Sequence, residues 1–251
     1  MVVYNMESKA LKMLSRDPKE NNRDYAYRVL KYNILTMWLT PGSTINENDY
    51  AAQLGVSRTP IHEALTILKS EYLVDIFPQS GSRVSLINFQ NIKDGVFLRN
   101  VVEPAIYKEL ENHLTTYYSN KMEENLNKTL SVIEKGNKTD DVGELFRLDD
   151  EFHYLAYEAT NKVLLWNSVK IVCSHFDRIR YAESVLKKSN LRHVYDEHMM
   201  LYEYILVGGM PNFDFEKHYD DHLSFFKGFF FKMYKEFPQY FEIDDKNHSN
   251  I

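Results

Sequence analysis

Histidines gather in one part of the sequence, and their spacing from a carboxylate is the first pattern that could do chemistry. Six of the nine histidines fall between positions 153 and 222. Asp149 and His153 are four residues apart, so a helix over this segment would project both side chains from one face. A carboxylate beside an imidazole suits a borderline divalent metal ion. The pattern therefore favours a metal site.

Two further histidines, His198 and His222, each follow an acidic residue and could complete such a site. An Asp/His/His/His set binds Zn²⁺, Ni²⁺ or Mn²⁺ and can leave coordination positions open. The alternative is that these are ordinary surface or core histidines. Both interpretations stay open, because spacing along the chain does not show that separate helices converge.

Enzymes built on the same residues fit the sequence less well. His218 and His222 are four residues apart and could bind zinc, but a zinc hydrolase of the zincin type needs Glu directly after the first His, where this chain has Tyr219. A di-iron bundle needs paired Glu-x-x-His motifs, and only Asp150-x-x-His153 distantly resembles one. The sequence therefore favours a binding protein over an enzyme.

The composition indicates a globular protein with two modest domains. The chain has 251 residues, of which 44% are apolar and 14% aromatic, and domains average roughly 150 residues. Its single cysteine, Cys173, allows no internal disulfide. The sequence shows neither a signal peptide nor a membrane span, so we expect a cytoplasmic protein that makes no contact with a membrane.

The net charge of −6 is distributed unevenly between the two parts of the chain. Residues 1–88 hold 10 Lys+Arg and 9 Asp+Glu, which leaves 20 and 27 for the remainder. The N-terminal part is therefore almost neutral at +1, and the rest carries −7. Any binding of nucleic acid must rest on a few well-placed groups instead of bulk charge.

Short elements with many turns come first in the chain. Apolar periodicity predicts a helix over 24–38. A second, short helix should follow Asn46 and end at Gly55, and a third should be capped by Thr59 with Pro60 in its first position. Residues 73–77 and 83–87 suit strands joined by 78–82. Two short helices followed by a hairpin predict a winged helix-turn-helix.

The third predicted helix could read DNA. It can lie in a major groove about 12 Å wide, with the Ser57 and Thr59 hydroxyls near phosphate and Arg58 paired with guanine. The alternative is a solvated face, because isolated surface cations such as Arg58, His62, Lys69 and Arg83 usually have no function.

From about residue 89 onward the pattern changes to long amphipathic helices. We expect six of them, near 90–112, 118–136, 140–160, 162–188, 190–207 and 212–236, packed as an antiparallel bundle. The predicted fold is therefore mainly α. The expected divisions are an arm at 1–22, which is either a short helix or disordered, a winged helix-turn-helix at 23–88, a ligand-binding bundle at 89–240 and a tail at 241–251.

The N-terminal motifs resemble the GntR family of bacterial transcriptional regulators. They are Pro41 to Glu47, the run Leu54 to Leu65, Leu73-Val74 and Gly81 to Val84. The resemblance implies that Ser57, Arg58 and Thr59 contact operator DNA and that Gly81 lies at the wing tip. His62 stands where the family usually has Arg, which weakens a cationic contact. His62 and Arg83 complete the expected DNA-binding set.

The C-terminal part resembles the FCD effector-binding domain of the FadR subfamily. The resemblance rests on the segments 98–105, 149–153 and 159–164 and on Glu197-His198 and His222-Leu223. It implies a helical bundle that holds a divalent metal and a small carboxylate effector. The implied ligands are Asp149, His153, His198 and His222. A loop at 207–212 that is longer than usual makes His218 the competitor of His222.

The expected function is a ligand-responsive regulator, most simply a repressor. Whether the effector releases or promotes DNA binding stays open, and the family resemblance implies release as the commoner outcome. Arg99, Arg178 and Arg180 are candidates to pair with the effector carboxylate, because guanidinium binds carboxylate bidentately. The chain should be a homodimer on palindromic operator DNA, since one short recognition helix reads too few bases. A metal-independent acyl or lipid-like ligand on the same fold is the alternative.

Overall fold

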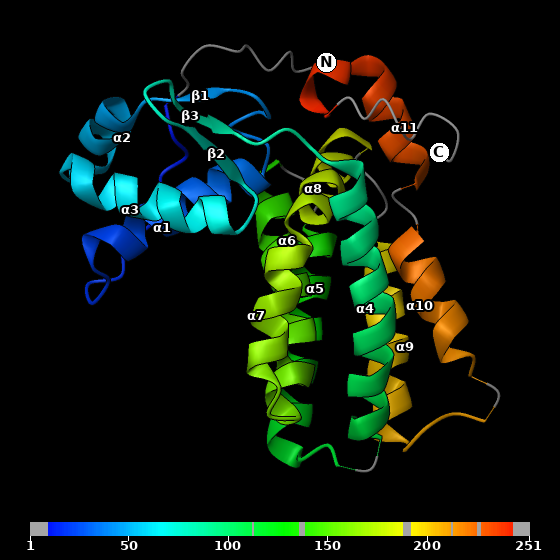
Figure 1. Ribbon diagram of the computed structural model, residues 1–251. Helices are drawn as coiled ribbons and strands as arrows, with labels where there is room; N and C mark the ends of the chain where they lie inside the picture. Colours follow the sequence, from blue (N-terminus) through cyan, green and yellow to red (C-terminus); the bar gives the residue numbers. More distant parts are fainter. Residues whose placement is uncertain are drawn as a thin grey trace. The chain divides into compact units, whose positions relative to one another are not determined.

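The computed structural model describes residues 10–111, 113–135, 139–187, 192–211, 213–224 and 227–242 (Figure 1). The chain forms two compact units. The first unit combines residues 1–93 with Ser174–Arg178 and Phe230–Ile251, and the second combines Asp94–Cys173 with Ile179–Phe229. Mainly helical structure, with a small sheet near the start of the chain, confirms the predicted fold class.

The first unit contains a helix-turn-helix with a three-stranded wing. Its elements in chain order are α1 (Asn22–Leu35), β1 (Thr44–Ile45), α2 (Glu47–Leu54), α3 (Arg58–Ser70), β2 (Val74–Phe77) and β3 (Gly81–Val84). The sheet is antiparallel in the order β1-β3-β2. The predicted hairpin is confirmed, although its second strand ends earlier than expected. Strand β1 was not predicted, because two residues are too few to show a pattern.

Capping residues set the ends of α2 and the start of α3. The Asn46 side chain accepts hydrogen bonds from the amides of Asn48 and Asp49 at the start of α2, and Gly55 ends that helix in the left-handed conformation with φ 64°, as expected. The predicted start of α3 is wrong by two residues. Ser57 is its N-cap, so Pro60 lies in the third helical position.

Helices α1 and α3 form the centre of the first core. Val29, Leu30, Ile61 and Leu65 are fully buried there, because their spacing along each helix places them on one face. Residues 10–14 add a segment without regular secondary structure, so this part of the arm is not a helix. The Asn33 side chain accepts from the Lys12 amide at 2.8 Å and donates to the Lys12 carbonyl at 3.0 Å, which holds this segment against α1.

The helical part of the chain begins with a long helix. Its elements are α4 (Phe89–Leu110), α5 (Thr116–Glu134), α6 (Thr139–Ala159), α7 (Val163–Val172), α8 (Ser174–Lys187), α9 (Arg192–Leu206), α10 (Phe215–Ser224), α11 (Lys227–Glu236) and a 3₁₀ turn at Pro238–Tyr240. The single helix predicted over 162–188 is two helices that meet at Cys173. The one predicted over 212–236 is described as α10 and α11, on either side of residues 225–226, which lie outside the described residues.

The second unit packs its helices around a buried centre. Phe152, Tyr157, Leu201 and Tyr219 are fully buried there, and α5 packs against both α6 and α9. Polar side chains are also buried in this interior. Such burial is unusual, so we look for the candidate site there. Within the part of the chain that the structure describes, no helix is both long enough and apolar enough to cross a membrane.

Candidate functional site

Three buried histidines from three helices meet inside the second unit. They are His153 of α6, His198 of α9 and His222 of α10, and each offers a ring nitrogen within 4.8 Å of the others. Each of the three residues is at most 2% exposed. His222 lies in this cluster, whereas His218 is half-buried one turn earlier on α10. The triad could therefore hold a metal ion.

Asp149 brings a carboxylate to the same place. It lies one turn before His153 on α6, and its Oδ1 is 3.5 Å from His198 Nε2. Both atoms are buried, and neither has a hydrogen-bond partner in the protein. Buried polar atoms without a hydrogen-bond partner are costly. Two of them that face each other fit a cation between them, and the donor set of one carboxylate and three imidazoles suits a borderline divalent metal.

The protonation states of these residues also suit metal binding. Burial lowers the pKa of His198 to about 3, and burial and the Arg99 charge hold the pKa of His153 well below its usual value. Both imidazoles are therefore neutral at pH 7. Burial alone would raise the pKa of Asp149, but the charge of Arg180 lowers it well below its usual value. A metal requires neutral imidazole and ionised carboxylate.

A second layer of side chains orients the candidate metal ligands. Glu197 Oε2 is 2.6 Å from His222 Nδ1, so this ring donates to the carboxylate and keeps Nε2 for a metal. The Asp149 Oδ2 atom accepts from Arg180 at 2.6 Å. The His198 ring stacks on Phe152, with centroids 4.5 Å apart. Glu197 was not predicted as a site residue, although its position directly before His198 was a usable signal.

Arg99 and Arg180 lie next to the histidine cluster. Arg99 forms a bidentate ion pair with Glu103, at 2.8 and 3.0 Å, and its Nη2 is 3.1 Å from His153 Nε2. Glu103 is fully buried and was missed from the sequence, although Arg99 and Glu103 have the i,i+4 spacing of helical ion pairs. The interior of the second unit therefore holds several fixed charges.

Arg178 differs from the other two arginines. It belongs to the first compact unit, is fully buried, and donates to the Ser85 carbonyl at 2.9 Å and to the Ser85 hydroxyl at 3.2 Å. Its neighbour His175 binds the Tyr72 carbonyl through Nε2 at 2.9 Å and accepts from the Asn88 amide through Nδ1 at 3.0 Å. This geometry favours Arg99 and Arg180 over Arg178 as partners of a carboxylate.

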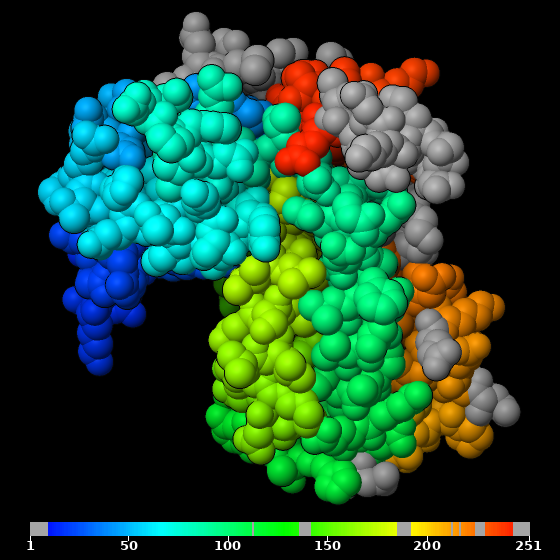
Figure 2. Space-filling view, in the orientation of Figure 1, coloured from blue at the N-terminus to red at the C-terminus, as the bar shows by residue number. Residues whose placement is uncertain are grey.

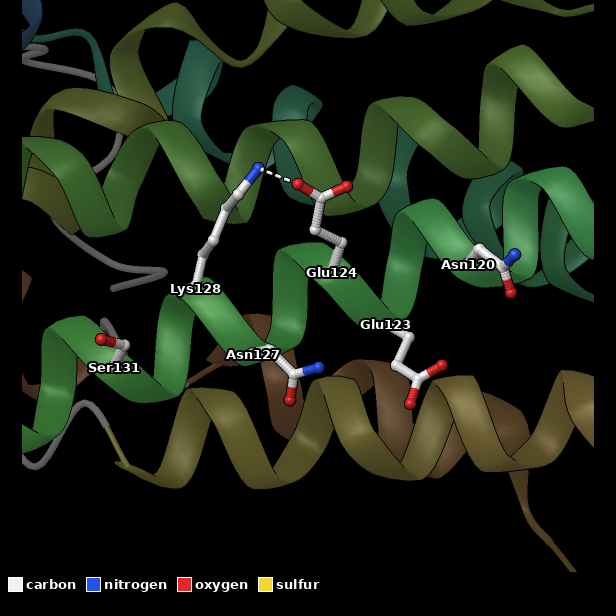
Figure 3. Close-up of a pocket in the computed structure, with 6 residues that line it drawn as sticks. All are labelled: Asn120, Glu123, Glu124, Asn127, Lys128 and Ser131. Atoms are coloured by element: carbon white, nitrogen blue, oxygen red, sulfur yellow. Dashed lines mark ion pairs between the residues drawn. The ribbon is translucent and has the colours of Figure 1, made fainter.

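A shallow hollow on the bundle does not resemble a ligand site. It is lined by six residues of α5 alone, as Figure 3 shows: Asn120, Glu123, Glu124, Asn127, Lys128 and Ser131. Glu124 and Lys128 form an exposed ion pair at 2.7 Å across it. Because one helix supplies the whole lining, nothing encloses a bound molecule.

The expected DNA-binding residues gather at the start of α3. Ser57, Arg58 and Thr59 are exposed, and the Ser57 side chain makes no capping hydrogen bond. Arg58 Nε donates to Glu47 Oε2 at 2.5 Å, and His62 Nδ1 lies 3.1 Å from Glu47 Oε1. One carboxylate of α2 thus contacts two candidate DNA-binding side chains, a link that the sequence analysis missed.

The wing carries the remaining two candidates. Gly81 begins β3 with φ 89°, a conformation that few other residues adopt. Arg83 is exposed on the same strand and pairs in register with Thr44 and Asp75. Both residues belong to the unit that contains α3.

Comparisons with known protein families match both parts of the chain. Residues 22–84 match the family described as "Bacterial regulatory proteins, gntR family", and residues 96–208 match the FCD domain. These matches agree with both sequence resemblances.

Individual proteins give the same result. The chain is 34% identical to an HTH-type transcriptional regulator in an unstable DNA locus of Streptomyces ambofaciens, over 67% of this chain and 68% of the relative. It is 29% identical to the HTH-type transcriptional repressor RspR of Escherichia coli, over 66% and 71%. The structure of E. coli McbR/YncC has the same fold, with a TM-score of 0.68, 18% identity and coverage of 87% and 99%.

Proposed function

Because the chain belongs to the GntR family of bacterial regulators, with a C-terminal FCD domain of the FadR type, we propose that it is a metal-dependent, effector-responsive repressor. Proteins of this family are DNA-binding transcription regulators and not enzymes. We further propose that residues 23–88 read DNA and that residues 89–240 sense the effector.

Two buried polar atoms without a hydrogen-bond partner, Asp149 Oδ1 and His198 Nε2, carry the metal part of this proposal. Asp149, His153, His198 and His222 would hold the ion, and when bound it supplies Lewis acidity toward a carboxylate oxygen. Zn²⁺, Ni²⁺ and Mn²⁺ are all compatible with this donor set. The effector we propose is a small organic acid, because a carboxylate is the group that both a metal and an arginine bind.

The surroundings of the cluster support a polar effector over an acyl chain. Arg99 and Arg180 supply positive charge, and the buried hydroxyl of Tyr157 has no hydrogen-bond partner in the protein. An apolar ligand would leave that hydroxyl unsatisfied, which costs about 1–3 kcal/mol. A hydroxylated organic acid could bond to it.

On DNA, α3 would lie in the major groove with Arg58 reading guanine and with Ser57 and Thr59 on phosphate. His62, Gly81 and Arg83 complete the proposed contacts. A homodimer would bind a palindrome with two recognition helices. The effector must bind one dimer arrangement more tightly than another, and a coupling of about 1–3 kcal/mol would change operator affinity 5–150-fold.

Two variants test the metal proposal on the full chain. Wild type, Asp149→Ala and His198→Ala are loaded with Zn²⁺, and bound zinc is measured after gel filtration. Wild type is used to select DNA duplexes from random sequences. The affinity of each protein for these duplexes is then measured with and without a panel of organic acids. We expect wild type to hold about one zinc and to respond to an acid, and both variants to lose zinc and response. His113→Ala, which replaces an exposed histidine, is the control.

The same experiment separates the alternatives. Variants that lose zinc yet keep the full response to an organic or acyl ligand would support a metal-independent sensor. If no organic acid of the panel makes wild type release the selected duplex while metal is present, the proposed effector class is contradicted.

A further inference from the structure

Residues 85–88 join β3 to α4, and we call them the connector. Residues that are distant in the sequence bond to it. Arg178 donates to the Ser85 carbonyl at 2.9 Å, and the Asn88 amide donates to His175 Nδ1 at 3.0 Å. The first residues of α8, which belong to the same compact unit, therefore hold the connector along one side.

A C-terminal segment, residues 238–242, also bonds to the connector, and we call it the strap. Ile87 and Phe241 form an isolated parallel β-bridge. The Ile87 amide donates to the Tyr240 carbonyl at 2.8 Å, and the Glu242 amide donates to the Ile87 carbonyl at 3.0 Å. Figure 2 shows the red surface of the strap next to the teal surface of the residues that lead into α4. The connector is therefore held from two sides within the first unit.

Aromatic packing anchors the strap. Phe241 is 3% exposed, and its ring centroid lies 5.3 Å from that of Phe230 and 5.4 Å from that of Tyr234. Both of these residues belong to α11. Phe230 also stacks on Phe89, the first residue of α4, with centroids 4.8 Å apart. The burial of such large rings favours the closed arrangement of the strap.

The strap should open more easily than the winged helix-turn-helix unfolds. Its pairing with the connector is a single bridge, whereas β2 and β3 pair over four residues of each strand. Parts of a protein with fewer contacts open at a lower free energy. The strap and the connector also lie outside both family matches, which cover residues 22–84 and 96–208. The pairing is therefore additional to what those matches imply.

We propose that the strap is a positioning element for DNA binding, which acts by fixing the connector between the wing and the start of α4. This inference rests on the DNA recognition and the homodimer of the proposed function and deepens them. Two linked readers bind a palindrome tightly only if their connections hold them at a suitable separation, and a freely moving connection lowers the effective concentration of the second reader. A closed strap therefore raises operator affinity.

One substitution removes a backbone hydrogen bond of the strap. Glu242→Pro deletes the N–H that donates to Ile87. Phe241 has φ −115° and ψ 147°, which is the conformation that a residue before proline prefers, so the substitution should cause no strain there. The matched control is Glu242→Ala. It keeps this N–H and removes only the carboxylate that accepts from the Asn88 side chain.

Amide hydrogen exchange of the full chain measures how often the strap opens. We expect the Ile87 amide to exchange about 10-fold faster in Glu242→Pro than in wild type or Glu242→Ala. Phe241→Ala, which removes the buried ring, should also speed this exchange, and Phe241→Tyr, which keeps the ring, should not. Equal exchange of Ile87 in all these proteins would overturn the proposal.

Helix α4 is held separately within the second unit, which supplies an internal reference. The Cys173 thiol donates to the Gly95 carbonyl at 3.5 Å, and a Cβ on Gly95 would lie 3.2 Å from Cys173 Cα. Amides of α4 after Gly95 should therefore exchange at the wild-type rate in every variant. Faster exchange there as well would show that the whole protein has loosened, and it would contradict a local role of the strap.

Affinity for the selected duplex tests the consequence for DNA binding. We expect Glu242→Pro and Phe241→Ala to bind it at least about 10-fold more weakly than wild type, as measured by fluorescence anisotropy. Bound zinc should be unchanged, and Glu242→Ala should bind like wild type. A duplex cut to one half-site should be bound equally by all variants, because a single reader does not depend on the connector. Equal losses on both duplexes would show a damaged reader and overturn the positioning role.

Failure of this inference is distinguishable from failure of the proposed function. If Glu242→Pro and Phe241→Ala bind the complete duplex like wild type, the role of the strap is rejected and the repressor proposal stands. If wild type selects no duplex at all, DNA recognition is rejected, and the positioning role is rejected with it.

Discussion

Glu47 contacts two side chains of the recognition helix at once. Its two oxygens meet Arg58 Nε and His62 Nδ1, and the side chains of Arg58 and His62 are 67% and 59% exposed. Because Glu47 holds Arg58 through Nε, the outer edge of the guanidinium stays directed away from the carboxylate. That edge still carries N–H groups, and a bidentate contact to guanine O6 and N7 needs two of them. Glu47 therefore restricts the orientation of the side chain that we expect to read sequence.

We predict that His62→Arg strengthens DNA binding. Arginine carries a full positive charge at every relevant pH, which histidine does not. One added phosphate contact should steepen the log–log salt dependence of binding by up to about 0.9. Fluorescence anisotropy on the selected duplex between low and moderate salt measures both quantities. His62→Gln, which adds no charge, is the control, and an unchanged slope and affinity for His62→Arg would refute the prediction.

His175 should make the protein less stable in mild acid. Burial lowers its pKa to about 3, and both ring nitrogens are bonded in a way that requires neutral imidazole. The unfolded chain takes up the proton near pH 6.5, so between pH 6.5 and 3 the unfolded state binds more protons and stability falls as pH falls. The expected loss is about 1.4 kcal/mol per pH unit in this window.

Urea unfolding at pH 7 and pH 5 with EDTA measures this effect. His175→Gln should reduce the loss of unfolding free energy between the two pH values by about 2 kcal/mol, while His113→Gln should leave it unchanged. An identical pH dependence of wild type and His175→Gln would show that this imidazole does not control the acid sensitivity.

At the scale of elements, the turn between α2 and α3 depends on one backbone conformation. Gly55 has φ 64°, and a Cβ there would meet no atom within 4 Å. Gly55→Ala should therefore cost about 1–2 kcal/mol from backbone strain alone, and Gly55→Asn should cost less, because asparagine tolerates this region. Thermal unfolding of the three proteins checks the order, and an alanine variant as stable as wild type would contradict it.

Element types were predictable from the sequence, and several boundaries were not. Asn46 and Gly55 fixed α2, because a cap and a left-handed glycine act locally. The start of α3 was missed because Ser57 and Thr59 are equally good caps and only packing decides between them. The separation of α7 from α8 at Cys173 was not predictable, because no glycine or proline lies near it to mark a break.

The candidate site was predictable only where one helix supplies it. Asp149 and His153 share a face of α6, so their spacing was informative. The meeting of His198 and His222 with them depends on how three helices pack, and only the family resemblance suggested it. Glu197 was missed because its partner His222 becomes a neighbour only in the folded interior. Glu103 was missed because a carboxylate four residues from an arginine looks like part of an ordinary surface ion pair in a sequence.

At the scale of the whole molecule, metal binding should increase the free energy of unfolding. Two buried atoms of the cluster, Asp149 Oδ1 and His198 Nε2, have no hydrogen-bond partner in the protein, so an ion that binds the folded state alone adds to the unfolding free energy. A Zn²⁺ concentration 100-fold above Kd should add about 2.7 kcal/mol. Calorimetry should show a higher Tm for wild type with Zn²⁺ than with EDTA, and no difference for Asp149→Ala. Equal shifts in both proteins would point to binding elsewhere.

The contact between Gly95 and Cys173 has a kinetic consequence. The thiol of Cys173, the single cysteine of the chain, is 1% exposed and covered by the backbone of α4. A thiol reagent can reach it only when α4 and the end of α7 separate. The rate of its modification, divided by that of an unfolded thiol, therefore gives the fraction of time that the bundle spends open at this point. The modification rate of this one thiol thus measures how often α4 and the end of α7 separate.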